Sequence, residues 1–98
     1  MIEKKISDLL ISYGVNTKSK GFEYTTYVLK QVYFYIINNY KYNLISIIKE
    51  IAYNENKAIS TIKAQIRYAV TTHNDYGGNL TLKDLEKVVK EKIGRGEL

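Results

Sequence analysis

The sequence of 98 residues contains no cysteine and no proline. The absence of cysteine excludes disulfide bonds, thiolate metal sites and a cysteine nucleophile, and it is typical of a reducing compartment. Without proline, no helical pattern is interrupted by a residue that lacks a backbone N–H. His73 is the single histidine, and no glutamate pair at metal spacing or glycine-rich phosphate loop accompanies it. We therefore expect no enzymatic activity, no cofactor and no metal site, and we interpret His73 as a surface residue or the partner of a helix C-terminus.

Long apolar segments are also missing. No run of about 18 apolar residues is present to span a bilayer. Residues 1–8 mix acids with lysines and lack the apolar centre of a signal peptide. We expect a cytoplasmic protein that does not insert into membranes.

The composition that is present is typical of one globular domain. Hydrophobic residues make up 45% and charged residues 26% of the chain, and this length suits a single core. The formal net charge of +5 favours nucleic acid or anionic lipid as a partner. The abundance of Ile, Lys, Asn and Tyr, which have AT-rich codons, raises the lysine content whatever the function. We expect residues 1–98 to form one domain.

The spacing of apolar residues predicts an all-α fold, a compact bundle of five or six helices. Apolar side chains recur three and four residues apart, which is the period of a helix rather than the alternation of a strand. Gly14 and Gly94 are expected to end the first and last helices, and Thr81 with Asp84 to form a capping box for the last. Residues 75–79 are expected to form a turn cluster and residues 94–98 to fray. The predicted helices cover residues 2–13, 22–38, 44–53, 59–73 and 82–93.

Two of these helices, 44–53 and 59–73, are joined by a short polar turn, which is the arrangement of a helix-turn-helix. Small Ala52 permits a close approach of the two helices, and Asn56 is suited to the positive φ that such a turn often requires. The same pattern is also typical of a plain helical hairpin in a bundle. The inward face of the second helix is predicted to consist of Ile59, Ile62, Ile66, Ala69 and Val70.

The outward face of residues 59–73 carries the candidate DNA-binding residues. No acid occurs between Asn56 and Asn74. A surface of this kind suits an approach to phosphates, while Lys and Arg can donate to guanine and the methyl groups of Ala and Thr can contact that of thymine. The alternative is a merely solvated helix face. The candidate site consists of Lys57, Ser60, Thr61, Lys63, Ala64, Arg67, Tyr68 and Thr71.

Four short motifs, in order along the chain, resemble one known family. They are Ile6-Ser7-Asp8-Leu9-Leu10 with Gly14-Val15, Lys20-Gly21-Phe22-Glu23-Tyr24, Ile51-Ala52 before the turn, and Ser60-x-Ile62-x-x-x-Ile66-Arg67-x-Ala69-Val70. Together they are similar to the C-terminal DNA-binding domain of the stage 0 sporulation response regulator of spore-forming Firmicutes. The resemblance implies a helical domain that places residues 59–73 in the major groove of double-stranded DNA and regulates transcription, binding promoter boxes in tandem or as a homodimer.

The chain also departs from this family. Ser60 and Arg67 match the pattern of the family's recognition helix, whereas Thr61, Lys63 and Ala64 replace its usual Arg, Glu and Arg. Residues 77–78, two glycines, lead almost directly to the last helix, where the family has a further helix implicated in contacting RNA polymerase. The sequence does not include the receiver domain of the full regulator. The resemblance therefore carries over neither the family's DNA box nor a contact with RNA polymerase.

Two alternatives stay open at the level of sequence. An interaction module would keep the fold, lack base readout and act by binding a full-length regulator or another protein. The aromatic residues between 24 and 42 are either a platform for partners or single strands, or, as we expect, half-buried packing with hydroxyls in water at the rim. They are Tyr24, Tyr27, Tyr33, Phe34, Tyr35, Tyr40 and Tyr42.

Overall fold

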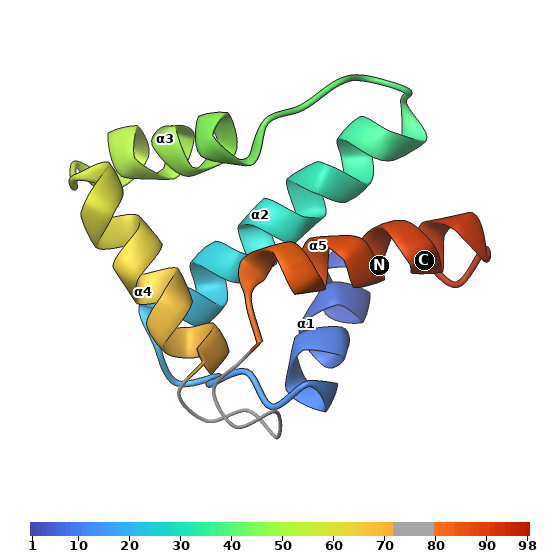
Figure 1. Cartoon of the computed structure of the whole chain (residues 1–98), viewed down its shortest axis with the longest axis horizontal. Helices are drawn as coiled ribbons and strands as arrows, with labels where there is room; N and C mark the ends of the chain where they lie inside the picture. Colours follow the sequence, from blue (N-terminus) through green and yellow to red (C-terminus); the bar gives the residue numbers. More distant parts are fainter. Residues whose placement is uncertain (72–79) are drawn as a thin grey trace.

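The computed structural model describes residues 1–71 and 80–98, and this part of the chain contains five α-helices and no strand (Figure 1). The all-α prediction is therefore confirmed. The predicted end of the fourth helix at 72 or 73, the single histidine His73 and the turn cluster at 75–79 lie outside the described residues. The helices are α1 (Ile2–Ser12), α2 (Lys20–Ile37), α3 (Leu44–Glu55), α4 (Ile59–Thr71) and α5 (Leu82–Gly94).

The longest helix, α2, crosses the centre of the molecule and contacts each of the other four helices (Figure 1). Because it is covered on several sides, even Thr25 and Thr26 in its first half are buried. Their hydroxyls donate to the carbonyls of Gly21 at 2.6 Å and Phe22 at 2.9 Å, so that neither buried hydroxyl lacks a partner. Helices α3 and α4 therefore both pack on a helix that is itself largely buried.

The predicted apolar faces turn inward, with one exception. Ile6, Leu10, Val28, Ile62 and Leu85 are all completely buried in the shared core. Ile59, predicted to face inward, is instead 36% exposed. It is the first residue of α4, and helical side chains lean toward the N-terminus, so Ile59 projects past the end of the helix rather than onto α3.

The helix ends follow the predicted punctuation closely. Gly14 has a φ of 77° after α1, and Thr81 and Asp84 form the predicted capping box of α5. Helix α2 starts two residues earlier than predicted, at Lys20, and α3 continues two residues further, to Glu55. Apolar spacing locates the buried face of a helix but leaves its polar ends undefined, which explains both shifts.

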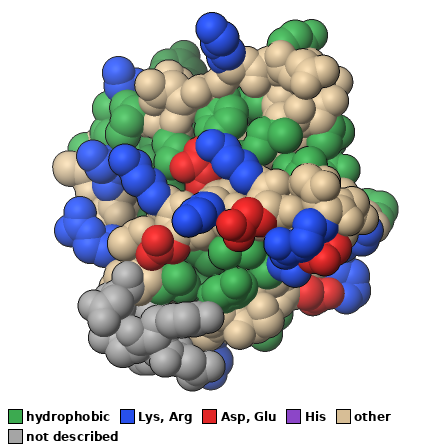
Figure 2. Space-filling model, turned by 45° about the vertical axis from the view of Figure 1, so that its right-hand side comes forward, with side chains coloured by type: hydrophobic (Ala, Val, Ile, Leu, Met, Phe, Trp, Pro, Cys, Tyr) green, Lys and Arg blue, Asp and Glu red, His purple; other side chains and the backbone are tan. Residues whose placement is uncertain are grey.

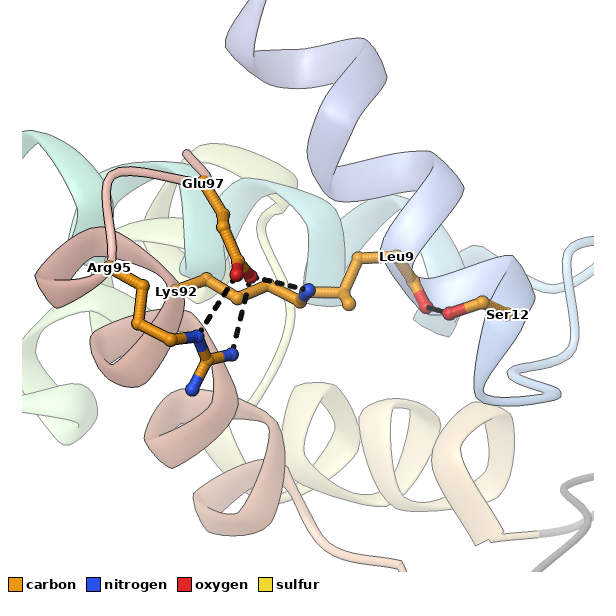
Figure 3. A network of polar contacts seen from close by, with 5 residues as sticks. All are labelled: Leu9, Ser12, Lys92, Arg95 and Glu97. Carbon is orange, nitrogen blue, oxygen red and sulfur yellow. Dashed lines mark hydrogen bonds and ion pairs between the residues drawn. The ribbon is translucent and has the colours of Figure 1, made fainter.

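The C-terminal residues, which were expected to fray, are held by a compact set of contacts (Figure 3). Helix α5 ends at Gly94 as predicted, but the left-handed glycine beyond it is Gly96, with a φ of 72°. Glu97 accepts from Lys92 Nζ at 3.2 Å and from Arg95 Nε at 3.1 Å, and these cations hold the pKa of the Glu97 carboxyl below its ordinary value. The side chain of Leu98 packs against the core.

Candidate nucleic-acid interface

The turn between α3 and α4 is short and closes α3 through a left-handed residue. Asn56 adopts the left-handed conformation, with φ 53° and ψ 47°, as predicted. An asparagine tolerates this conformation better than most residues because its short polar side chain suits it. The N–H of Lys57 then donates to the carbonyl of Ala52 at 3.0 Å, which closes α3 and directs the chain into α4. Ile62 and Ile66, both buried, occupy the angle between the helices.

The outward face of α4 carries most of the predicted site on one exposed surface. Thr71 differs, because it is half-buried and its Oγ1 donates to the carbonyl of Arg67 at 2.7 Å. Lys57 is exposed in the turn that precedes α4. The remaining predicted residues, all exposed, are Ser60, Thr61, Lys63, Ala64, Arg67 and Tyr68.

The charge on this surface has one sign. Within residues 1–71 and 80–98, no ion pair involves Lys57, Lys63 or Arg67. Some basic side chains elsewhere are paired, as Lys4 is with Asp8 at 2.9 Å, whereas others, such as Lys49 and Lys87, also have no ion pair among the described residues. Figure 2 shows basic side chains along the left-hand edge of the molecule and acidic ones mixed with basic ones toward the middle and right. A face with cations that lack described acidic partners is suited to an anionic ligand.

One flank of α4 borders a groove against the start of α2. The groove has a volume of about 460 Å³ and is lined by Ser19, Lys20 and Gly21 of the α2 start and by residues of α4 that include Thr61 and Tyr68. Sequence reasoning did not place Ser19 or Lys20 in the candidate site, because they lie far from α4 along the chain. The available indication was Gly21, since a glycine near the start of a helix often marks a close approach of another backbone.

The other flank of α4 borders a more apolar groove. It has a volume of about 260 Å³, and Ile66, Val70 and Leu80 contribute to its floor. Lys63 and Arg67 line the same groove. The two predicted cations of α4 therefore lie on the flank opposite to Lys20.

Two tyrosine hydroxyls of α2 hydrogen-bond to α3, the helix that precedes α4. The hydroxyl of Tyr24 donates to Glu55 Oε1 at 2.9 Å, and that of Tyr27 donates to Glu50. A third hydroxyl, of Tyr42, donates to Glu86 of α5. These three hydroxyls donate to carboxylates of other helices, and the Tyr27–Glu50 bond is itself exposed. The predicted half-buried packing is found for Tyr27, Tyr33, Tyr35 and Tyr42, whereas Tyr24 is buried and Phe34 and Tyr40 are exposed. The sequence did not indicate these pairs, because nothing local relates a tyrosine to a glutamate more than twenty residues away.

These contacts lead us to expect that the domain loses stability at alkaline pH. Burial, the hydrogen bond to Glu50 and the negative charge of Glu50 together raise the pKa of Tyr27 from 10.0 to about 12. Because the folded pKa exceeds the unfolded one, the stabilisation is complete below pH 10 and is lost as the pH rises toward about 12. Tyr27→Phe should therefore flatten the decrease of the urea midpoint between pH 9 and 12. Tyr53→Phe, at an exposed position, is the matched control, and equal slopes for the two variants would contradict the role of Tyr27.

Comparisons of the chain with protein families, curated proteins and solved structures find no match. In the described part of the chain, no cluster of three or more His, Asp or Glu side chains is arranged to hold a metal ion. Among the same residues, no helix combines the length and apolar character needed to cross a membrane.

Proposed function

We propose that this protein binds double-stranded DNA as a transcription regulator, with α4 as its recognition helix in the major groove. The observation that carries the proposal is the outward face of α4, where Lys63 and Arg67 have no ion-pair partner among the described residues and no acid interrupts residues 57–71. A helix about 10–12 Å in diameter fits a major groove about 12 Å wide. The resemblance to the sporulation regulator family agrees with this arrangement.

The side chains on this face suit distinct roles. Lys57 in the turn approaches a phosphate, and Lys63 and Arg67 contact phosphates or guanine edges. The hydroxyls of Ser60 and Thr61 bond to bases or phosphates, and the methyl group of Ala64 contacts that of thymine. Since Thr61, Lys63 and Ala64 differ from the usual residues of the family, we propose a DNA box of its own for this protein, bound in tandem or as a homodimer. The protein acts in the cytoplasm without catalytic activity.

The salt dependence of duplex binding tests the proposal. If Lys57, Lys63, Arg67 and one further lysine contact phosphates, the logarithm of the binding constant should fall with the logarithm of salt concentration at a slope of roughly −3 to −4. Fluorescence anisotropy with a labelled duplex measures this slope. The duplex comes from selection out of a random pool, which also defines the box. A flat dependence, or no binding at low salt, would show that the proposed function is wrong.

A second candidate function is an interaction module that binds a regulator or another protein. The apolar groove formed by Ile66, Val70 and Leu80 beside Lys63 and Arg67 favours it, because partners bury apolar side chains in such grooves. Absence of duplex binding at low salt, together with capture of a protein partner that Leu82→Ala, at a half-buried position lining the same groove, weakens without loss of helicity, would support this second candidate against the first.

A further inference from the structure

We infer that the start of α2 contacts the second sugar–phosphate strand of the bound duplex, with Lys20 as the phosphate-binding side chain. The inference rests on the proposed DNA binding and adds a contact that the candidate site lacks. A helix in the major groove lies between two sugar–phosphate strands. One flank of α4 presents Lys63 and Arg67, and the other opens into the groove that contains Lys20. Each strand then meets cations of this protein.

The close crossing of α2 and α4 fixes the position of Lys20. Gly21 lies so near α4 that a Cβ placed on it would be 2.0 Å from the carbonyl oxygen of Gln65 and 2.8 Å from the Cβ of Ala69. The first turn of α2 therefore cannot move relative to the recognition helix without breaking this contact. The backbone of Lys20, the preceding residue, is therefore held beside α4.

The turn before α2 is ordered by its own hydrogen bonds. The hydroxyl of Ser19 donates to the carbonyl of Asn16 at 3.1 Å, and the N–H of Lys18 donates to Asn16 Oδ1 at 3.0 Å. The N–H of Asn16 in turn donates to the carbonyl of Ala69 in α4 at 3.0 Å. The segment that carries Lys20 is thus attached to α4 at two points, Asn16 and Gly21.

Lys20 is free to exchange its present partner for a phosphate. Its ammonium is 3.5 Å from Glu23, three residues along α2, and the two side chains are 56% and 67% exposed. An exposed pair of this kind stabilises a fold only weakly, because water screens both charges. A phosphate in the groove can therefore displace Glu23 at little cost.

Removing the charge of Lys20 tests the inference. Lys20→Gln should make the salt slope of duplex binding less negative by about 1 and weaken binding about fivefold at 0.15 M salt, equally for selected and random duplexes. Lys5→Gln is the matched control, because Lys5 is also exposed but lies on α1, which is not in contact with α4. Circular dichroism verifies that both variants fold.

A second measurement determines which DNA strand each lysine contacts. Single phosphates of the selected duplex are replaced, one at a time, by neutral methylphosphonates. The affinity of Lys20→Gln should not change when its contact phosphate on one strand is replaced, because that contact is already lost. The affinity of Lys63→Gln should likewise not change when a phosphate on the other strand is replaced. This pattern is a direct sign that the two cations lie on opposite sides of the recognition helix.

The outcomes separate this inference from the proposed function. If the wild type binds duplex with the expected slope and Lys20→Gln keeps that slope, the contact of Lys20 is wrong and the proposed function stands. Equal losses of affinity in Lys20→Gln and Lys5→Gln would also overturn the inference. So would a result in which Lys20→Gln and Lys63→Gln are both insensitive to replacements on the same strand. If the wild type does not bind duplex at low salt, both are wrong.

Discussion

Gly21→Ala is expected to lower the free energy of unfolding by about 3 kcal/mol, the upper part of the range for overpacking a tight contact. The added Cβ would lie 2.0 Å from the carbonyl oxygen of Gln65, and this neighbour is backbone rather than the flexible end of a side chain. The clash is relieved only if α2 and α4 separate, which opens the core around Val28 and Ala69. Urea denaturation followed by circular dichroism measures the loss.

Gly94→Ala is the matched control for this experiment. A Cβ on Gly94 meets no atom within 4 Å, and alanine is favoured over glycine in a helix by about 0.5–1 kcal/mol. We therefore expect Gly94→Ala to retain or slightly raise the urea midpoint. A midpoint for Gly21→Ala equal to that of the wild type would mean that α2 and α4 do not cross at this glycine.

The double variant Lys63→Ala/Arg67→Ala is expected to weaken duplex binding about 100-fold, since each lost contact costs about 1.4 kcal/mol or more. Both side chains are exposed on the outward face of α4 and have no ion pair among residues 1–71 and 80–98. The salt slope should also become less negative by about 2, because two fewer cations displace counterions. Anisotropy titrations at several salt concentrations give both quantities.

The fold of this variant must be shown to be intact for the loss to be informative. Substitutions of exposed residues outside the core usually change stability by at most about 0.5 kcal/mol, so the thermal midpoint should stay near that of the wild type. Lys4→Ala/Lys5→Ala removes two charges from α1 and serves as the control for net charge. Equal affinity losses in the two double variants would argue against α4 as the recognition helix.

Much of the candidate interface could be predicted from the spacing of residues along the chain. The exposure of Ser60, Ala64 and Arg67 follows from the helical period once the apolar residues are placed inward. The left-handed Asn56 follows from the requirements of the turn. Ile59 was misplaced because a periodic pattern treats every turn of a helix alike, whereas a residue in the first turn has no preceding turn beneath its side chain.

The contacts that position the interface could not be predicted from the sequence, because they join residues that are far apart along the chain. Tyr24 and Glu55 are 31 residues apart in the sequence, and Lys20 is similarly remote from the residues of α4 that border the same groove. The carbonyl of Gln65 that approaches Gly21 is a backbone group, so that no side chain pattern indicates it.

The sequence by itself determined the five helices, their apolar faces and the turn between α3 and α4. These features depend on interactions between residues three or four positions apart, which repeat along the chain and can be recognised locally. Only the tertiary structure decided that Tyr24 and Tyr27 bind α3, that Gly21 lets α2 cross α4, and that Lys20 lies beside α4. Those arrangements depend on how whole helices pack, and ridge-and-groove packing permits several crossing angles for the same apolar stripes.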